Sequence, residues 1–231
     1  MSKLLVEERN LVIPGQEVAT GIDYLPSVGT AREGENIIAT RVGLLTLKGR
    51  VLKVIPLRGK YIPKVGDTVI GRISDVGMSG WRVNIGWAFV ASLRLAEASE
   101  RFIPRDADLT NYFDVGEYVA CKITRTTVSR YIDVTAKGPG LRKLDTGRII
   151  KCDSSKVPRI IGKKGSMISM LKEASDCRIM VGQNGIVWIS GQDSDKELLV
   201  EKTIRLIEER SHEHGLTDVV SKYLEDNKQN G

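Results

Sequence analysis

Two glycines bracket a pair of lysines in Gly162-Lys163-Lys164-Gly165, between two short segments with helical spacing. A loop that grips a nucleic-acid backbone needs glycines, because a Cβ would hold the phosphate away from the main chain. The second segment begins directly after the loop. The free amides and the positive dipole end of its expected helix would therefore face a bound phosphate. This loop has the composition of a phosphate clamp with two lysines at its tip.

The charge around the loop is positive, although the whole chain is only mildly basic. Its 231 residues include 35 Lys plus Arg and 29 Asp plus Glu, a formal charge of +6. From Ser154 to Lys172 no residue is acidic, and the basic ones are Lys156, Arg159, Lys163, Lys164 and Lys172. Such a local field suits a polyanionic partner. Taken alone, however, Gly-x-x-Gly is also typical of a plain turn between two helices.

The segments around the loop predict an α+β module. The expected elements are a strand at 148–150, helices at 156–161 and 166–174, strands at 178–181 and 186–189, and helices at 193–212 and 216–225. In this order the module resembles the type I KH family. The resemblance implies that Gly162 to Gly165 clamp the backbone of about four nucleotides, with Arg159, Lys163 and Lys164 as further RNA contacts. Ile161 and Ile168 would line either a groove for the bases or the core beneath it.

The middle of the chain predicts a small β-barrel. Trp81, Val83 and Ile85 alternate with Arg82 and Asn84, which puts the apolar side chains on one face of a strand. The same alternation recurs at Val119, Cys121 and Ile123, and again at Ile132 and Val134. Several short strands, with a charged loop from Glu97 to Asn111, are typical of a Greek-key barrel.

Residues from Gly66 to Lys137 resemble the S-one family of RNA-binding OB barrels, which implies a five-stranded barrel. Members of this family commonly present an aromatic side chain on the second strand for base stacking. Here Arg82 takes the outward position and Trp81 points inward, which suggests contacts with phosphates instead. The outward RNA-binding candidates are Arg82, Arg94, Lys122 and Tyr131. Solvated surface charge explains Arg82 and Lys122 equally well, and Trp87 is left undecided between core and surface.

The first part of the chain, from Leu11 to about Pro63, predicts a small all-β domain, because short β-rich runs alternate with Gly and Pro. No acidic residue interrupts a basic run of Arg41, Lys48, Arg50, Lys53, Arg58, Lys60 and Lys64. Three explanations fit this run: a surface that binds the phosphates of a nucleic acid, a docking surface for an acidic protein, or a solvated edge that resists aggregation. With a linker at Gly138-Pro139-Gly140, the expected domains are 1–62 (β domain), 63–137 (barrel) and 138–231 (KH domain).

Several kinds of chemistry lack the residues that they need. Cys121, Cys152 and Cys177 are odd in number and widely spaced, so they indicate neither a disulfide framework nor a CxxC zinc site, and they favour a reducing compartment. His212 and His214 are two apart, so they would face different directions on a helix; we expect both to be solvated. No signal peptide is visible and no apolar run reaches the roughly 18 residues of a membrane span. We expect a cytoplasmic protein without a catalytic site, a metal or a cofactor.

The order of β domain, S-one barrel and KH module resembles the RNA-binding cap subunits of the archaeal exosome, which are related to eukaryotic cap proteins of ribosomal-RNA processing. The likeness includes Val12-Ile13-Pro14-Gly15 and the segment from Val28 to Gly34. It implies a trimeric or mixed cap on a phosphorolytic exoribonuclease ring. The first domain would dock on the ring, while the barrel and the KH module bind single-stranded RNA and guide its 3′ end to the pore.

Three rival classes share parts of this arrangement. A transcription elongation or antitermination factor carries an S-one barrel followed by KH modules. Here a second KH module is missing, and the N-terminal region is predicted to be β rather than helical. An enzyme of the polynucleotide phosphorylase type has its KH module before the barrel, and needs a large catalytic domain that this sequence lacks. A self-contained nuclease needs clustered carboxylates or histidines for metal, and the sequence has no such cluster.

Overall fold

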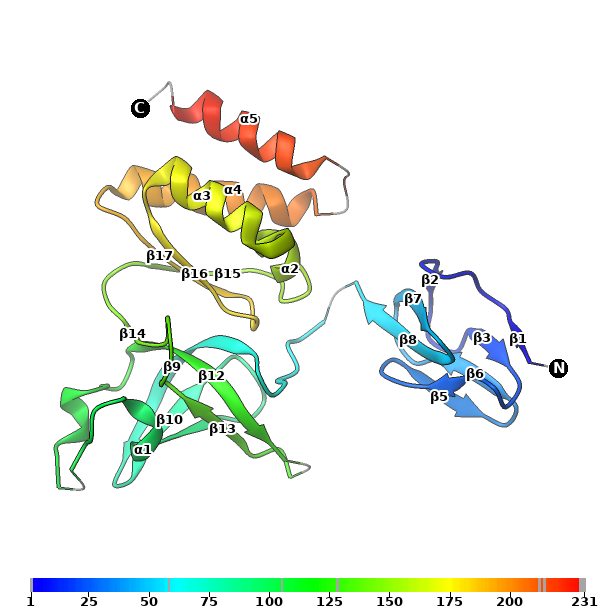
Figure 1. Ribbon diagram of the computed structural model, residues 1–231, viewed down its shortest axis with the longest axis horizontal. Helices are drawn as coiled ribbons and strands as arrows, with labels where there is room; N and C mark the ends of the chain where they lie inside the picture. Colours follow the sequence, from blue (N-terminus) through cyan, green and yellow to red (C-terminus); the bar gives the residue numbers. More distant parts are fainter. Residues whose placement is uncertain are drawn as a thin grey trace. The chain divides into compact units, whose positions relative to one another are not determined.

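The computed structural model describes residues 2–57, 59–104, 106–127, 129–211, 213 and 215–228, leaving aside the side chain of Lys228. Arg58, His212 and His214 lie outside this part of the chain. Contacts divide the chain into two compact units, Met1–Gly59 and Lys60–Gly231, and each is described by itself (Figure 1).

The first unit consists of two four-stranded sheets around one core. One sheet has the order β1-β3-β6-β5, with bounds Lys3–Leu4, Glu17–Thr20, Asn36–Ala39 and Thr30–Glu33. The other has the order β2-β7-β8-β4, with bounds Leu11–Val12, Gly43–Lys48, Val51–Pro56 and Leu25–Pro26. Along β8, Leu52 and Val54 are buried while Val51, Lys53 and Ile55 are exposed, as in a strand with one face on the core. The predicted all-β character is confirmed.

Five strands of the second unit close into a barrel. They are β9 (Thr68–Gly77), β10 (Gly80–Asn84), β11 (Ala91–Arg94), β12 (Tyr118–Thr126) and β13 (Ile132–Thr135). They pair in the order β9-β10-β11-β13-β12, and β12 pairs again with β9. Only the β11–β13 pair is parallel among the pairs of this barrel. The predicted five-stranded OB-type barrel is confirmed, and the short strand β14 (Lys143–Leu144) adds to β12.

The alternating apolar side chains fill the barrel as predicted. Trp81 is 2% exposed, its indole N–H donates to the carbonyl of Phe113 at 2.8 Å, and the two rings meet edge-on with centroids 5.3 Å apart. The connection between β11 and β12 is more ordered than the expected charged loop. It contains a short helix α1 (Leu95–Ala98) and a 3₁₀ turn η1 (Leu109–Asn111), and it buries Ile103 and Leu109.

The rest of the second unit is an α+β module with a three-stranded antiparallel sheet in the order β15-β17-β16. Its strands are β15 (Arg148–Lys151), β16 (Arg178–Val181) and β17 (Ile186–Ser190). Its helices are α2 (Val157–Ile161), the 3₁₀ turn η2 (Lys163–Gly165), α3 (Ser166–Ser175), α4 (Ser194–Glu209) and α5 (Leu216–Lys228). The helices pack on one face of the sheet (Figure 1). This is the element order of a type I KH module, and the prediction is confirmed.

The hairpin between β16 and β17 ties the KH module to the barrel. The side-chain amide of Asn184 donates to the carbonyls of Ile70 and Ile85, at 2.7 and 2.9 Å, and accepts from the backbone N–H of Ile70 at 3.2 Å. An apolar cluster from both modules surrounds this contact: Ile70, Ala120, Leu144, Ile186 and Trp188. Barrel and KH module therefore form one compact unit.

The three cysteines are free thiols. Burial raises the pKa of Cys121 and of Cys152 to about 12, and it also raises the pKa of Cys177. All three therefore stay protonated near neutral pH and are weak nucleophiles. Within the described part of the chain, no helix has the length and apolar character to cross a membrane.

Candidate nucleic-acid interface

The glycine loop of the KH module uses backbone conformations that favour glycine at two places. Helix α2 ends at Gly162, where φ is +76°, and α3 follows Gly165, where φ is +84°. A Cβ at Gly162 would lie 2.7 Å from the backbone nitrogen of Met167, so a side chain does not fit there. Around Gly165 the nearest atom to such a Cβ is Cγ2 of Ile168, at 3.9 Å. The main chain at Gly165 is therefore open to an approaching phosphate.

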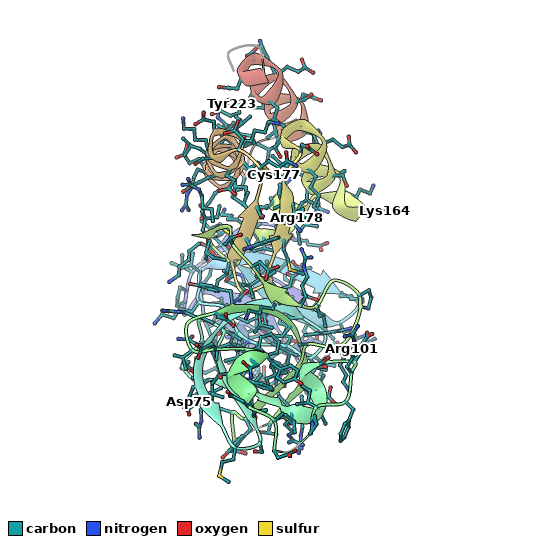
Figure 2. All side chains as sticks on the ribbon, turned by 90° about the vertical axis from the view of Figure 1, so that its left-hand side faces the viewer. Asp75, Arg101, Lys164, Cys177, Arg178 and Tyr223 are labelled. Carbon is teal, nitrogen blue, oxygen red and sulfur yellow. The ribbon has the colours of Figure 1, made fainter. Side chains whose placement is uncertain are left out.

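Lys163 and Lys164 lie exposed at the tip of this loop. Lys164 has a φ of +54°, and Figure 2 shows its side chain standing out from the surface. Neither lysine is in an ion pair with any residue that the structure describes. Arg159, at the end of α2, is also exposed. The loop thus presents three cations beside the free amides at the start of α3.

Ile161 and Ile168 flank the loop, and both are half-buried. Ile168 packs against the core of the KH module while keeping part of its surface in solvent. The two side chains therefore belong to the rim of the core and to the surface beside the loop. An apolar surface next to a phosphate clamp is what unstacked bases require.

A groove of about 1270 Å³ lies on the outside of the barrel. It is lined by residues of β10 and β11, the β9–β10 turn, α1 with the loop that follows, and the start of β13. The basic side chains of the lining are Arg82, Arg94, Arg101 and Lys137, against the acidic Asp75 and Glu100. Asp75 and Arg101 are labelled in Figure 2. In OB folds, oligonucleotides bind over the second and third strands and the adjoining loops, and the net charge of this groove suits them.

Three of the four barrel residues predicted from the sequence line this groove, namely Arg82, Arg94 and Tyr131. Tyr131 is 72% exposed, so its ring is accessible. Lys122 is exposed on β12 but does not line the groove. No KH residue is in the lining. The structure therefore separates the predicted residues into a loop site on the KH module, a groove on the barrel, and one lysine apart from both.

Ion pairs engage two of the cations in the groove to different degrees. Nε of Arg82 lies 3.6 Å from the Asp75 carboxylate, but the side chains are 68% and 62% exposed, so solvent screens the pair. Nη2 of Arg94 donates to Asp133 at 3.2 Å, and the Asp133 side chain is only 19% exposed. Arg82 is therefore the more available of the two for a phosphate.

Among the other residues of the groove, Arg101, Phe102 and Lys137 have side chains suited to RNA and were not predicted from the sequence. Arg101 and Phe102 come from the segment that was expected as a charged loop. Phe102 is 88% exposed, which is unusual for a large aromatic side chain. A basic residue directly followed by an aromatic one was the available signal, because nucleic-acid surfaces combine the two types.

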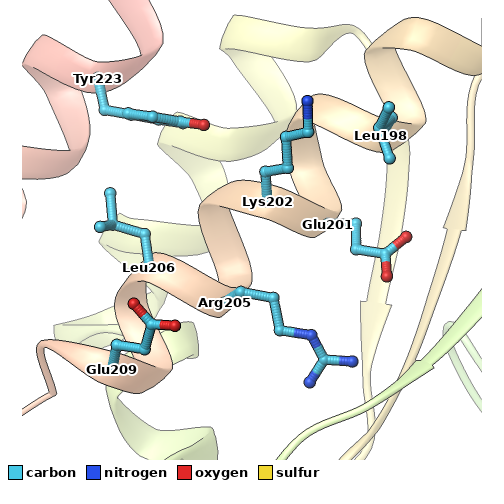
Figure 3. A pocket seen from close by; sticks show the side chains of 7 residues that line it. All are labelled: Leu198, Glu201, Lys202, Arg205, Leu206, Glu209 and Tyr223. Atoms are coloured by element: carbon cyan, nitrogen blue, oxygen red, sulfur yellow. The ribbon is translucent and has the colours of Figure 1, made fainter.

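A smaller hollow of about 320 Å³ lies between α4 and α5 (Figure 3). Its lining is Leu198, Glu201, Lys202, Arg205, Leu206, Glu209 and Tyr223. Two carboxylates balance two cations there, and Glu201 is already paired with Arg148 at 3.0 Å. The hollow therefore offers no net positive field for phosphate. Among the described residues, no group of three or more His, Cys, Asp or Glu side chains is placed to hold a metal ion.

Comparisons with known proteins match both modules of the second unit. A family model described as the RRP4 S1 domain matches residues 60–125, and one described as the KH domain matches residues 147–209. The exosome complex component Rrp4 of Thermococcus kodakarensis is 43% identical over 97% of this chain and 88% of its own. The protein of the same name from Pyrococcus furiosus is 42% identical over 97% of this chain and 86% of its own. A crystal structure of a protein assigned to the exosome complex as RNA-binding is 32% identical, with a TM-score of 0.66, over 74% of this chain and 98% of that one.

Proposed function

Because this chain belongs to the Rrp4 family of exosome complex components, we propose that it is a non-catalytic, cytoplasmic RNA-binding cap subunit. It recruits single-stranded RNA and guides the 3′ end to a phosphorolytic exoribonuclease ring for degradation and processing. The observation that carries the proposal is the loop Gly162–Gly165, with an open backbone at Gly165 and exposed lysines at its tip. Such a loop grips phosphates without selecting among bases, as a subunit that handles many RNAs needs.

The three parts of the chain divide the work in this proposal. Residues 1–62 anchor the subunit to the ring, while the barrel (63–137) and the KH domain (138–231) bind RNA. Contacts to phosphate come from Arg159, Lys163 and Lys164 on the KH module, and from Arg82 on the barrel. Tyr131 adds a ring for a base, and Arg94 and Lys122 add positive charge around it. No reacting group is needed, because chemistry belongs to the ring.

The outer face of one sheet in the first unit supports the anchoring role. In the register of β2, β7 and β8, Leu11 lies opposite Leu44, which lies opposite Ile55. At the other end of the sheet, Val51 lies between Lys48 and Leu25. Leu11 and Leu25 are 54% exposed and Ile55 is 47% exposed. Exposed apolar side chains of this kind mark protein interfaces. Lys53 lies between the two apolar groups on β8 and Lys48 lies beside Val51, and both lysines suit an acidic partner.

The cap would hold three copies of this chain, or fewer in a mixed cap, around the entrance of the ring. Co-purification from the native source tests the assignment. We expect the subunits of an exoribonuclease ring to accompany the tagged chain, and the purified chain alone to leave labelled RNA intact with or without phosphate and Mg²⁺. Recovery of RNA polymerase without ring subunits would support a transcription factor instead, a class that shares the barrel and KH folds but not the names of the relatives reported above.

A further inference from the structure

Two aromatic side chains and an arginine meet on the barrel surface, and none of the three belongs to the RNA contacts proposed so far. Trp87 and Phe89 come from the connection between β10 and β11, and their ring centroids are 5.3 Å apart at an angle of 57°. The guanidinium carbon of Arg130, from the connection between β12 and β13, lies 5.5 Å from the centroid of Phe89. We call these three residues the aromatic cluster.

The cluster keeps its rings partly in water. Phe89 is 42% exposed although Arg130 lies over it, and Trp87 is half-buried where it packs against the barrel core. Arg130 holds its place with a φ of +64°, a left-handed conformation that is uncommon for a residue with a side chain. The turn between β12 and β13 supports this conformation, because the N–H of Arg130 donates to the carbonyl of Thr127 at 2.9 Å, and it directs the guanidinium over Phe89.

The cluster adjoins the groove of the barrel. Val90 follows Phe89 in the chain and lines the groove, and so does Tyr131, which follows Arg130. A strand of RNA whose phosphates lie along the cations of the groove would therefore bring its next base to the cluster. Aromatic rings and guanidinium planes are the surfaces on which unpaired bases stack.

We propose that Trp87, Phe89 and Arg130 form a stacking site for one unpaired base of single-stranded RNA, at the end of the barrel groove. The inference rests on the proposed RNA-binding function. It adds a contact with a base to a surface whose other proposed contacts are mainly with phosphates. It also supplies the stacking that the barrel lacks on its second strand, where Arg82 stands in place of an aromatic residue. Stacking is tolerant of sequence, because every base has a π-face.

A pair of RNA ligands separates base stacking from binding to the backbone. Oligouridylate and an abasic ribose-phosphate strand of the same length carry the same charge, but only the first has bases to stack. Stacking is worth about 1–3 kcal/mol per base, so Phe89→Leu in the full chain should weaken oligouridylate binding about 5- to 140-fold. The affinity for the abasic strand should not change. Val115→Ala is the control, since Val115 is 58% exposed on the barrel outside the groove and the cluster.

Arg130→Lys tests the guanidinium separately. Lysine retains the positive charge and meets the same strain at a φ of +64°, but it lacks the planar group that stacks on a base. This variant should therefore lose affinity for oligouridylate and keep it for the abasic strand. Unchanged affinity for both strands would mean that Arg130 acts as a charge only, and equal losses on both would mean that its guanidinium contacts the backbone; either result would contradict a stacking role for it.

Trp87 provides a direct signal. Trp81 and Trp188 are each 2% exposed, whereas Trp87 is half-buried, so stacking of a base should quench the fluorescence of Trp87 selectively. Oligouridylate should quench the tryptophan fluorescence of the wild-type chain, and the abasic strand should leave it unchanged. In the Trp87→Phe variant, oligouridylate should no longer cause quenching.

Three outcomes with Phe89→Leu would overturn the inference. The first is that both RNA affinities stay unchanged, and the second is that both fall equally. The third is intact RNA binding with weaker assembly on the ring, which would identify a protein partner. If the wild-type chain bound neither strand, the proposed function would fail as well, so the two failures are distinguishable.

Discussion

At the scale of single residues, the proposed function predicts that RNA binding by the KH module depends most on Lys163 and Lys164. Both are exposed at a loop tip, so Lys163→Asp with Lys164→Asp should leave the fold intact and weaken RNA binding. Removing one phosphate interaction with a single strand flattens the slope of log K against log salt by about 0.7, so removing two changes it by roughly 1.4. Charge reversal adds repulsion that is greatest at low salt. Filter binding at several salt concentrations measures both effects.

The control for this variant is a second pair of lysines on the same module. Lys196→Asp with Lys222→Asp makes the same change in net charge, at exposed positions on α4 and α5 away from the loop. Its salt slope should match that of the wild-type chain. If the two pairs behaved alike, the glycine loop would be only a turn and binding would depend on overall charge.

Replacing Gly162 or Gly165 with alanine should lower the free energy of unfolding by different amounts. Both have a positive φ, so Gly165→Ala should cost about 1–2 kcal/mol of stability from backbone strain. Gly162→Ala should cost more, because its Cβ also meets the backbone of Met167 at 2.7 Å, whereas the space at Gly165 is open. Urea denaturation followed by tryptophan fluorescence gives the order of the two midpoints. A midpoint for Gly162→Ala equal to that for Gly165→Ala would contradict the close approach to Met167.

At the scale of elements, the contact between hairpin and barrel depends on Asn184. Asn184→Ala leaves the carbonyls of Ile70 and Ile85 without its two hydrogen bonds, and each buried group left unpaired costs about 1–3 kcal/mol. We expect a clearly lower urea midpoint for the full chain. Gln183→Ala is the matched control, because Gln183 contacts the barrel through its backbone N–H, which donates to Thr68 at 2.8 Å. Similar midpoints for the two variants would mean that the apolar cluster alone holds the modules together.

Periodicity predicted the elements well where one face of a strand or helix is buried. The alternation at Trp81, Val83 and Ile85, and the helical spacing that became α4, are local consequences of that burial. The barrel groove could not be predicted in the same way. Arg101 and Lys137 reach it from segments distant in the chain, and the contact of Arg130 with Phe89 depends on two loops meeting. Contacts between residues that are distant in the chain depend on the tertiary structure, and no periodic pattern in the sequence indicates them.

At the scale of the whole molecule, the first unit is predicted to hold the subunit on the ring through the outer face of β7 and β8. Val51→Asp with Ile55→Asp places charge on exposed apolar positions, so the unit should still fold while association with the ring is lost. Ile22→Asp, at a position that is 85% exposed outside the strands of that sheet, should leave association unchanged. Size-exclusion chromatography with ring subunits measures both. Normal association of the double variant with the ring would mean that the docking surface lies elsewhere.

The division between a recruiting cap and a catalytic ring is tested most directly by the rate of RNA degradation at RNA concentrations well below saturation. We expect the ring with the wild-type chain to degrade a labelled single-stranded RNA faster than the ring alone. The complex with the Lys163→Asp and Lys164→Asp variant should assemble normally but lose most of that acceleration, and the chain without the ring should degrade nothing. Equal rates with the wild-type chain, with the variant and without either would contradict the account.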